Sequence, residues 1–167
     1  HEMRFELDRS RPHDIRAERQ GLQVVIRSSE LQPGHPCCRL VVKSDKLKNP
    51  ATLEKFLRAI LRAEQFAATN RAETLDAIQK YVKLDRDILE AGYYSPHLEQ
   101  GTDANARGTR AFWDTLVQAE FIDGQRPLEP IFALDIYERA LKSLAAESPA
   151  EPFWQNLLQA SAARNTL

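Results

Sequence analysis

The chain has 167 residues, of which 43% are hydrophobic and 28% charged, a balance typical of globular proteins. Its 23 Lys and Arg residues against 24 Asp and Glu residues give a net charge of −1, which argues against a nucleic acid as the main partner. No run of about 20 apolar residues occurs, so the sequence predicts no membrane-spanning helix.

The first 20 residues are rich in charge and form a separate segment, which we interpret as a remnant or as added residues. They contain no signal-peptide pattern. Either an export signal has been removed or the chain begins inside a longer protein. We expect the folded part to cover residues 21–167.

Two short strands are predicted in the first third of the chain. Residues 22–26 are a β-branched run that follows Gly21, and residues 37–42 are a second apolar run, interrupted by Arg39. The stretch between them contains two prolines and other turn residues, which predicts a loop. Because two short strands are not stable alone, we expect them to pair with strands from missing sequence or from a second copy.

The pattern changes to helix at Asn49. Asn49 is a favourable N-cap and Pro50 suits the first turn, while apolar residues at helical spacing continue to about Asn70. Further helices are predicted at about 70–83, 85–91, 103–121 and 134–146, and after residue 149. The predicted fold class is therefore α/β, with two short strands followed by five or six helices.

The order of these segments resembles a known family. A short apolar strand at 35–43, a few charged residues, then Asn-Pro and a long helix at 49–63 are similar to the C-terminal half of the nitrate/sulfonate/taurine solute-binding proteins of ABC transporters. Residues 118–122, 130–132 and 136–141 resemble the closing segments of that family. The resemblance runs from about residue 21 to 144 and implies part of a type II periplasmic-binding-protein lobe, in the thiamin-pyrimidine synthase-like superfamily.

The resemblance implies a function and a location. The chain would be the solute-binding component of an importer for a small anion or organic solute, with the ABC transporter membrane subunits as partners. It would be periplasmic or extracytoplasmic and would carry no cofactor. Family members have two α/β lobes around the ligand, and this chain matches only part of them. The alternative is a truncated lobe that forms a homodimer and acts as an interaction or structural module without ligand capture.

Under this resemblance, the candidate ligand contacts lie beside the crossover between lobes or in a loop near an aromatic pair. Arg39 could pair with an oxyanion through its guanidinium fork, although a surface arginine at a strand edge is the simpler interpretation. The aromatic candidate can line a pocket or simply pack at the end of a helix. The candidate ligand-binding residues are Ser28, Ser29, His35, Arg39 and Tyr93.

The two cysteines, Cys37 and Cys38, are adjacent and give no disulfide framework. With His35 they could bind a soft metal, but the spacing matches no zinc finger, and we expect no metal site. An iron-dependent thiamin-pyrimidine synthase is disfavoured because that family carries a longer cysteine-rich motif.

Motifs for catalysis are absent from the sequence: it has no Gly-rich phosphate loop, no Gly-x-Ser-x-Gly elbow and no His-Glu-x-x-His. Two carboxylate pairs, Asp85 with Asp87 and Glu99 with Asp103, are expected to be solvated. We therefore predict no catalytic residue and no enzyme activity.

Overall fold

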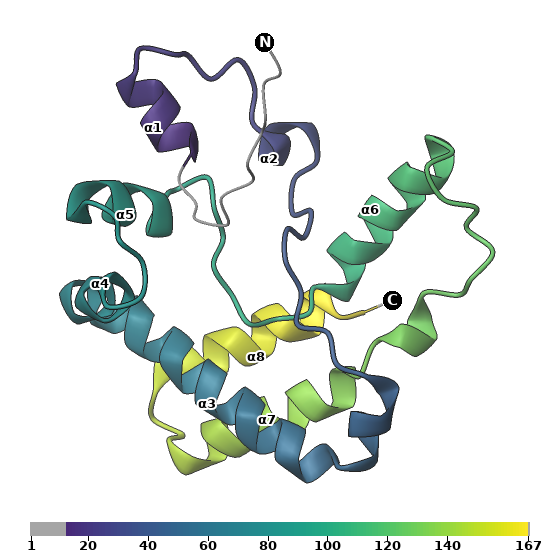
Figure 1. Ribbon diagram of the computed structural model, residues 1–167. Helices are drawn as coiled ribbons and strands as arrows, with labels where there is room; N and C mark the ends of the chain where they lie inside the picture. Colours follow the sequence, from purple (N-terminus) through teal and green to yellow (C-terminus); the bar gives the residue numbers. More distant parts are fainter. Residues whose placement is uncertain (1–12, 167) are drawn as a thin grey trace. The chain divides into compact units, whose positions relative to one another are not determined.

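The computed structural model describes residues 13–166, and throughout this range the regular structure is helical (Figure 1). Short α-helices and a 3₁₀ turn occupy the first part of the range, and longer helices follow. The elements are α1 (His13–Arg19), α2 (Ser28–Leu31), η1 (Ser44–Lys48), α3 (Pro50–Thr69), α4 (Arg71–Gln79), α5 (Arg86–Tyr93), α6 (Ala106–Gln118), η2 (Glu129–Ile131), α7 (Leu134–Glu147) and α8 (Pro152–Arg164).

The predicted α/β class is wrong, because no strand forms between residues 13 and 166. Residues 22–26 and 37–42 have β-branched sequences but lie as irregular connections. A strand forms only when its backbone groups pair with those of a neighbouring strand, and no such ladder of hydrogen bonds is present among the described residues. The part of a periplasmic-binding-protein lobe that the family resemblance implied is therefore not formed.

The helical predictions were more successful. Helix α3 begins at Pro50, as the Asn-Pro pair predicted, and the Thr52 amide donates to the Asn49 side chain at 3.4 Å. The helix predicted at 103–121 is shorter in the structure, where α6 runs from Ala106 to Gln118. Two short helices, α1 and α2, occupy stretches that were interpreted as a charged segment and a loop.

The chain divides into two compact units. Unit 1 contains the described residues up to Leu31 together with Ala67–Gln100, and unit 2 contains Gln32–Phe66 and Gly101–Leu167. The boundary at residues 66 and 67 falls inside α3. Each unit is described separately below.

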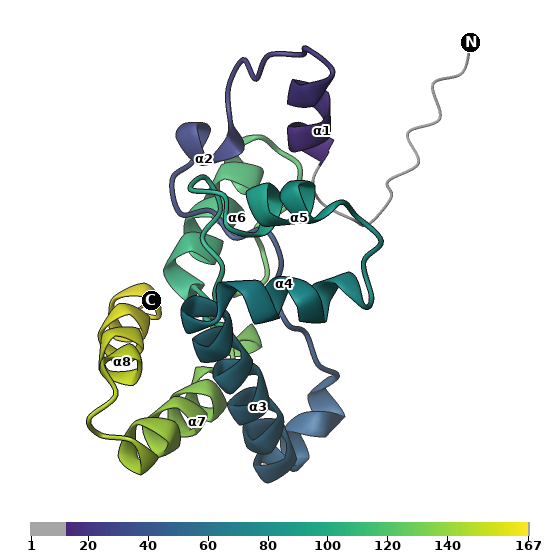
Figure 2. The same cartoon turned by 90° about the vertical axis from the view of Figure 1, so that its left-hand side faces the viewer.

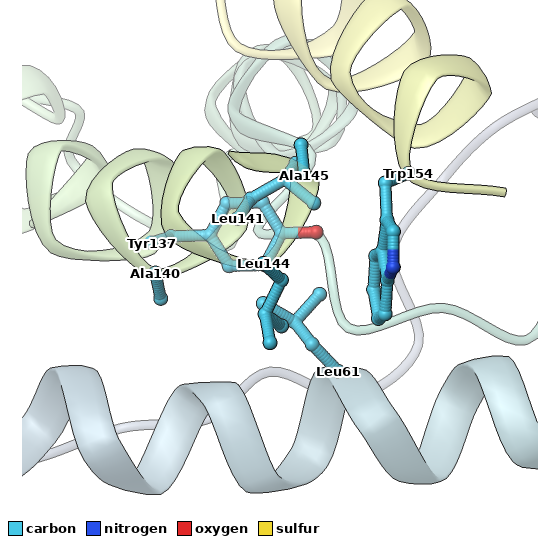
Figure 3. Packing of buried hydrophobic residues seen from close by; sticks show 7 residues of the cluster. All are labelled: Leu61, Tyr137, Ala140, Leu141, Leu144, Ala145 and Trp154. Atoms are coloured by element: carbon cyan, nitrogen blue, oxygen red, sulfur yellow. The ribbon is translucent and has the colours of Figure 1, made fainter. Parts of the chain in front are cut away.

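Unit 2 contains the main apolar core. Leu61 of α3, Leu141 and Leu144 of α7 and Trp154 of α8 are each at most 3% exposed. Figure 3 shows Leu61 pointing toward the α7 side chains, with the Trp154 ring beside them. The core is therefore built from α3 and from two consecutive helices, α7 and α8, that lie much further along the chain.

The N-terminus of α6 explains why a glycine is placed inside a helix. Asn105 has a left-handed backbone, with φ of 48°, and caps α6 by accepting a hydrogen bond from the Gly108 amide at 3.0 Å. The Asn105 side chain also donates to the Gly34 carbonyl at 2.9 Å. A Cβ atom at Gly108 would collide with that carbonyl oxygen, so the close approach of the loop requires glycine there.

Unit 1 has a smaller apolar core. Leu75 of α4 and Ile88 and Leu89 of α5 are buried, and α5 also contacts α1 (Figure 2). Arginine side chains join its segments: Arg27 reaches Asp14 and Glu18 of α1 at 3.2 and 2.9 Å. Unit 1 is therefore stabilised both by its few buried apolar side chains and by the ion pairs that join Arg27 to α1.

Candidate functional site

The five candidate ligand contacts are divided between the units. Ser28, Ser29 and Tyr93 belong to unit 1, whereas His35 and Arg39 belong to unit 2. Ser28 opens α2 and is exposed, while Ser29 is half-buried. The Tyr93 ring packs edge-on against the Tyr94 ring, with 4.9 Å between their centroids. Tyr93 therefore packs against its neighbour at the end of α5, and its role as a ligand contact stays a prediction.

His35 lies where the loop after α2 turns toward α6. Its backbone amide donates to the Gln32 carbonyl at 3.2 Å, and its Nδ1 atom lies 2.9 Å from the same oxygen. The ring centroid is 6.2 Å from that of Phe112 in α6. The side chain therefore anchors its own loop.

Arg39 also turns back onto the protein. Its Nε donates to the Ala104 carbonyl at 2.6 Å and its Nη1 to the Cys38 carbonyl at 2.5 Å. Burial lowers the pKa of this guanidinium, and the nearby Asp103 carboxylate opposes that effect. Because backbone oxygens occupy part of its donor fork, Arg39 holds residues 38–39 against the loop that precedes α6.

A buried polar cluster in unit 2 was missed in the sequence. Asp103 is only 6% exposed and accepts hydrogen bonds from the Asn105 amide at 2.6 Å and the Asn165 side chain at 3.0 Å. The Asn165 side-chain oxygen in turn accepts from the Ala106 amide at 3.1 Å. The expectation that Asp103 is solvated is wrong, since this carboxylate ties the start of α6 to the end of α8.

Glu64 of α3 lies in the same cluster. It accepts hydrogen bonds from the amide and the hydroxyl of Thr102, and that hydroxyl lies 3.3 Å from the Tyr137 hydroxyl. Burial raises the pKa of Glu64, the Asp103 charge raises it further, and the bonds from Thr102 oppose both. Burial also raises the pKa of Tyr137 far above its usual value.

This cluster has the composition of an acid–base site, but its groups already bind one another. The Glu64 carboxylate accepts from Thr102, and the Asp103 carboxylate accepts from Asn105 and Asn165. Its members are contributed by α3, the loop at 101–105, α7 and α8, so no sequence motif could have revealed it. We assign the cluster to the stability of unit 2.

A pocket of about 670 Å³ opens where the starts of α3 and α7 meet. Phe132 and Ile136 are among its apolar lining residues, and Glu54, Asp135 and Arg139 are its charged ones. Arg139 pairs with Asp135 at 2.8 Å and Glu54 at 3.5 Å, so it does not present an open fork to an oxyanion. None of the five candidate ligand contacts lines this pocket.

Within residues 13–166, no group of three or more His, Cys, Asp or Glu side chains is arranged to hold a metal ion. In the same range, no helix combines the length and the apolar character needed to span a bilayer. Comparisons of the chain with protein-family models, with curated proteins and with solved structures found no match.

Proposed function

We propose that the chain is a non-catalytic interaction module, in which residues 40–42 bind an extended segment of a partner protein. The observation that supports this proposal is the exposure of apolar side chains on an unpaired backbone. Leu40 and Val41 are 59% and 84% exposed. No backbone group of residues 40–42 makes a hydrogen bond within the described part of the chain.

Both features favour binding of a partner strand. Removing a Val or Leu side chain from water contributes about 1.5–3 kcal/mol. An extended partner would also satisfy the N–H and C=O groups that now face solvent, as in the addition of a strand to an open edge. The following residue, Lys43, already has extended backbone angles, with φ of −64° and ψ of 142°.

Charge indicates the chemistry of the partner. Lys43, Lys46 and Lys48 are exposed, and no carboxylate among the described residues forms an ion pair with them. Asp45 is the single acidic residue between Lys43 and Lys48. An acidic, apolar segment would complement this stretch. In an antiparallel pair of two copies centred on Val41, Arg39 would face Lys43, and such like-charge pairs are destabilising.

The test uses two fluorescent peptides that alternate valine with either glutamate or lysine. We expect the whole chain to bind the glutamate peptide, and Val41→Asp to weaken binding at least tenfold. Phe121→Asp is the matched control, because Phe121 is 79% exposed elsewhere in unit 2. Equal binding by Val41→Asp, or preference for the lysine peptide, would contradict the proposal.

Light scattering tests whether a second copy of the chain, instead of an acidic partner, binds residues 40–42. The homodimer stays a prediction, and under our proposal the chain is monomeric without its partner. A dimer that Val41→Asp dissociates and Phe121→Asp does not would show that the occupant is a second copy, and would overturn the acidic partner.

Solute capture for an importer, the function that the family resemblance implied, is the second candidate. It stays a prediction. A thermal-shift titration with nitrate and taurine tests it, because a ligand that binds only the folded state raises the unfolding temperature. Stabilisation by either compound would support capture and would contradict a module that works without ligand.

A further inference from the structure

The two adjacent thiols of Cys37 and Cys38 lie on the same side of the chain. In an extended strand, neighbouring side chains point to opposite faces, but here the backbone bends at Cys37. The Sγ atoms are 3.7 Å apart, both residues are exposed and no disulfide joins them. We propose that Cys37 and Cys38 form a two-sulfur site for one soft, thiophilic cation, of which Cu⁺ is the biological example.

The backbone on both sides of the pair is already fixed. Before it, the His35 amide and ring are held at the Gln32 carbonyl, and Pro36 restricts its own backbone angle φ. After it, Arg39 donates to the Cys38 carbonyl at 2.5 Å and to the Ala104 carbonyl at 2.6 Å. Because these contacts hold the flanking backbone, less backbone freedom is lost when both sulfurs bind one ion.

Arg39 also supplies charge to the site. Its Nη1 donates to the Cys38 carbonyl at 2.5 Å, so the guanidinium lies beside the cysteine pair. Two thiolates and one Cu⁺ together carry a charge of −1. The nearby guanidinium offsets that charge.

The number of ligands selects the ion. Structural Zn²⁺ requires four ligands, and within residues 13–166 no third His, Cys, Asp or Glu joins this pair. Soft thiolate ligands select Cu⁺, which is stable with two sulfurs. Binding releases up to two thiol protons to solvent and forms two S–Cu bonds, with no change in oxidation state.

The decisive experiment titrates the intact, reduced protein with Cu⁺ under anaerobic conditions, in competition with a chromophoric Cu⁺ chelator. The chain has only two cysteines, so thiolate ligation reports on this pair alone. We expect one Cu⁺ per chain, and at least tenfold weaker binding in Cys37→Ser and in Cys38→Ser. The double variant measures binding by the histidines and by the thioether of Met3, and its value is subtracted.

The site would be overturned if Cys37→Ser or Cys38→Ser bound Cu⁺ as tightly as the parent, or if Zn²⁺ competed on equal terms. A complex with one Cu⁺ per two chains in light scattering would also overturn it, because the sulfurs would then come from different molecules. Arg39→Gln should weaken Cu⁺ binding several-fold and keep one ion per chain. Unchanged affinity in that variant would remove Arg39 from the site.

Phenylarsine oxide gives an independent measurement. Its arsenic forms two S–As bonds while the oxygen leaves as water with both thiol protons, so a single thiol cannot complete the reaction. Mass spectrometry should show a stable adduct on the parent and none on either single variant after a glutathione wash. An adduct that survives the wash on a single variant would contradict the paired geometry. Peptide binding at residues 40–42 plays no part in either readout.

Discussion

The two units of this chain are stabilised by different means. In unit 2, Leu61, Leu141 and Trp154 from three helices form a buried apolar cluster. In unit 1, the buried apolar set is smaller, and ion pairs of Arg27, Arg71 and Arg86 join its segments. A buried leucine truncated to alanine costs 2–5 kcal/mol, whereas an exposed ion pair contributes about 0–1 kcal/mol. We therefore expect unit 1 to open first in hydrogen exchange.

The largest effect is expected from Leu141→Ala. Leu141 is 1% exposed in the core of unit 2, and its truncation should lower the free energy of unfolding by about 3 kcal/mol. Urea unfolding followed by tryptophan emission measures this, because Trp113 and Trp154 both belong to unit 2. The control Leu40→Ala, at a position 59% exposed, should change stability by less than about 0.5 kcal/mol. Equal losses in the two variants would show that the cluster is not the core.

Gly108→Ala should have the next largest effect. Alanine is the better helix former by about 1 kcal/mol, yet its Cβ would collide with the Gly34 carbonyl and the Asn105 side chain. We expect a net loss of about 1–3 kcal/mol from overpacking, measured by the same urea unfolding. At Gly101 the nearest atom is 3.7 Å away, so Gly101→Ala is the matched control and should be nearly neutral. Stabilisation by Gly108→Ala would contradict the observed approach of the loop.

Arg27→Gln tests the ion pairs of unit 1. The Arg27 side chain is 18% exposed and reaches both Asp14 and Glu18. Its loss should cost about 1 kcal/mol, seen as faster hydrogen exchange in α1. In 1 M NaCl the difference from the parent should shrink, because salt screens the pairs. Lys142→Gln, which removes an exposed pair within α7, should cost only about 0.3 kcal/mol. Equal exchange rates in parent and Arg27→Gln would show that the apolar contacts hold α1 alone.

The smallest effect concerns the pH dependence of unit 2. Because burial raises the pKa of Glu64 above its ordinary value of 4.5, the folded state retains the Glu64 proton to higher pH than the unfolded chain. Its contribution to stability is therefore full below that value and is lost as the pH rises through the folded pKa. Glu64→Gln should flatten the fall in unfolding free energy as the pH rises above 4.5. Glu73→Gln, at an exposed position in α4, is the control and should keep the slope of the parent.

Other carboxylates act at lower pH and with the opposite sign. Hydrogen bonds from arginines lower the pKa of Asp87, Asp135 and Glu147, so their stabilising contributions are lost as the pH falls. In the upper pH range, the difference between Glu64→Gln and the parent therefore reports on Glu64. An unchanged slope in Glu64→Gln would show that this carboxyl is solvated.

The candidate site was predictable only in part. The sequence identified His35, Arg39 and the cysteine pair as chemically capable, and these residues do lie in one stretch of unit 2. It could not show that Arg39 binds the Ala104 carbonyl, or that Asp103 is buried beside Asn165. Both contacts join residues more than 60 positions apart, which no local pattern in the sequence reveals.

Local chemistry in the sequence determined where the longer helices lie. The Asn49–Pro50 start and the apolar spacing that follows it specify α3 without reference to any other part of the chain. Tertiary structure alone decided the fate of residues 22–26 and 37–42. A helix satisfies its backbone groups within itself, whereas a strand needs a neighbour. The same two apolar runs therefore predict strands from the sequence, but they form no strand among the described residues.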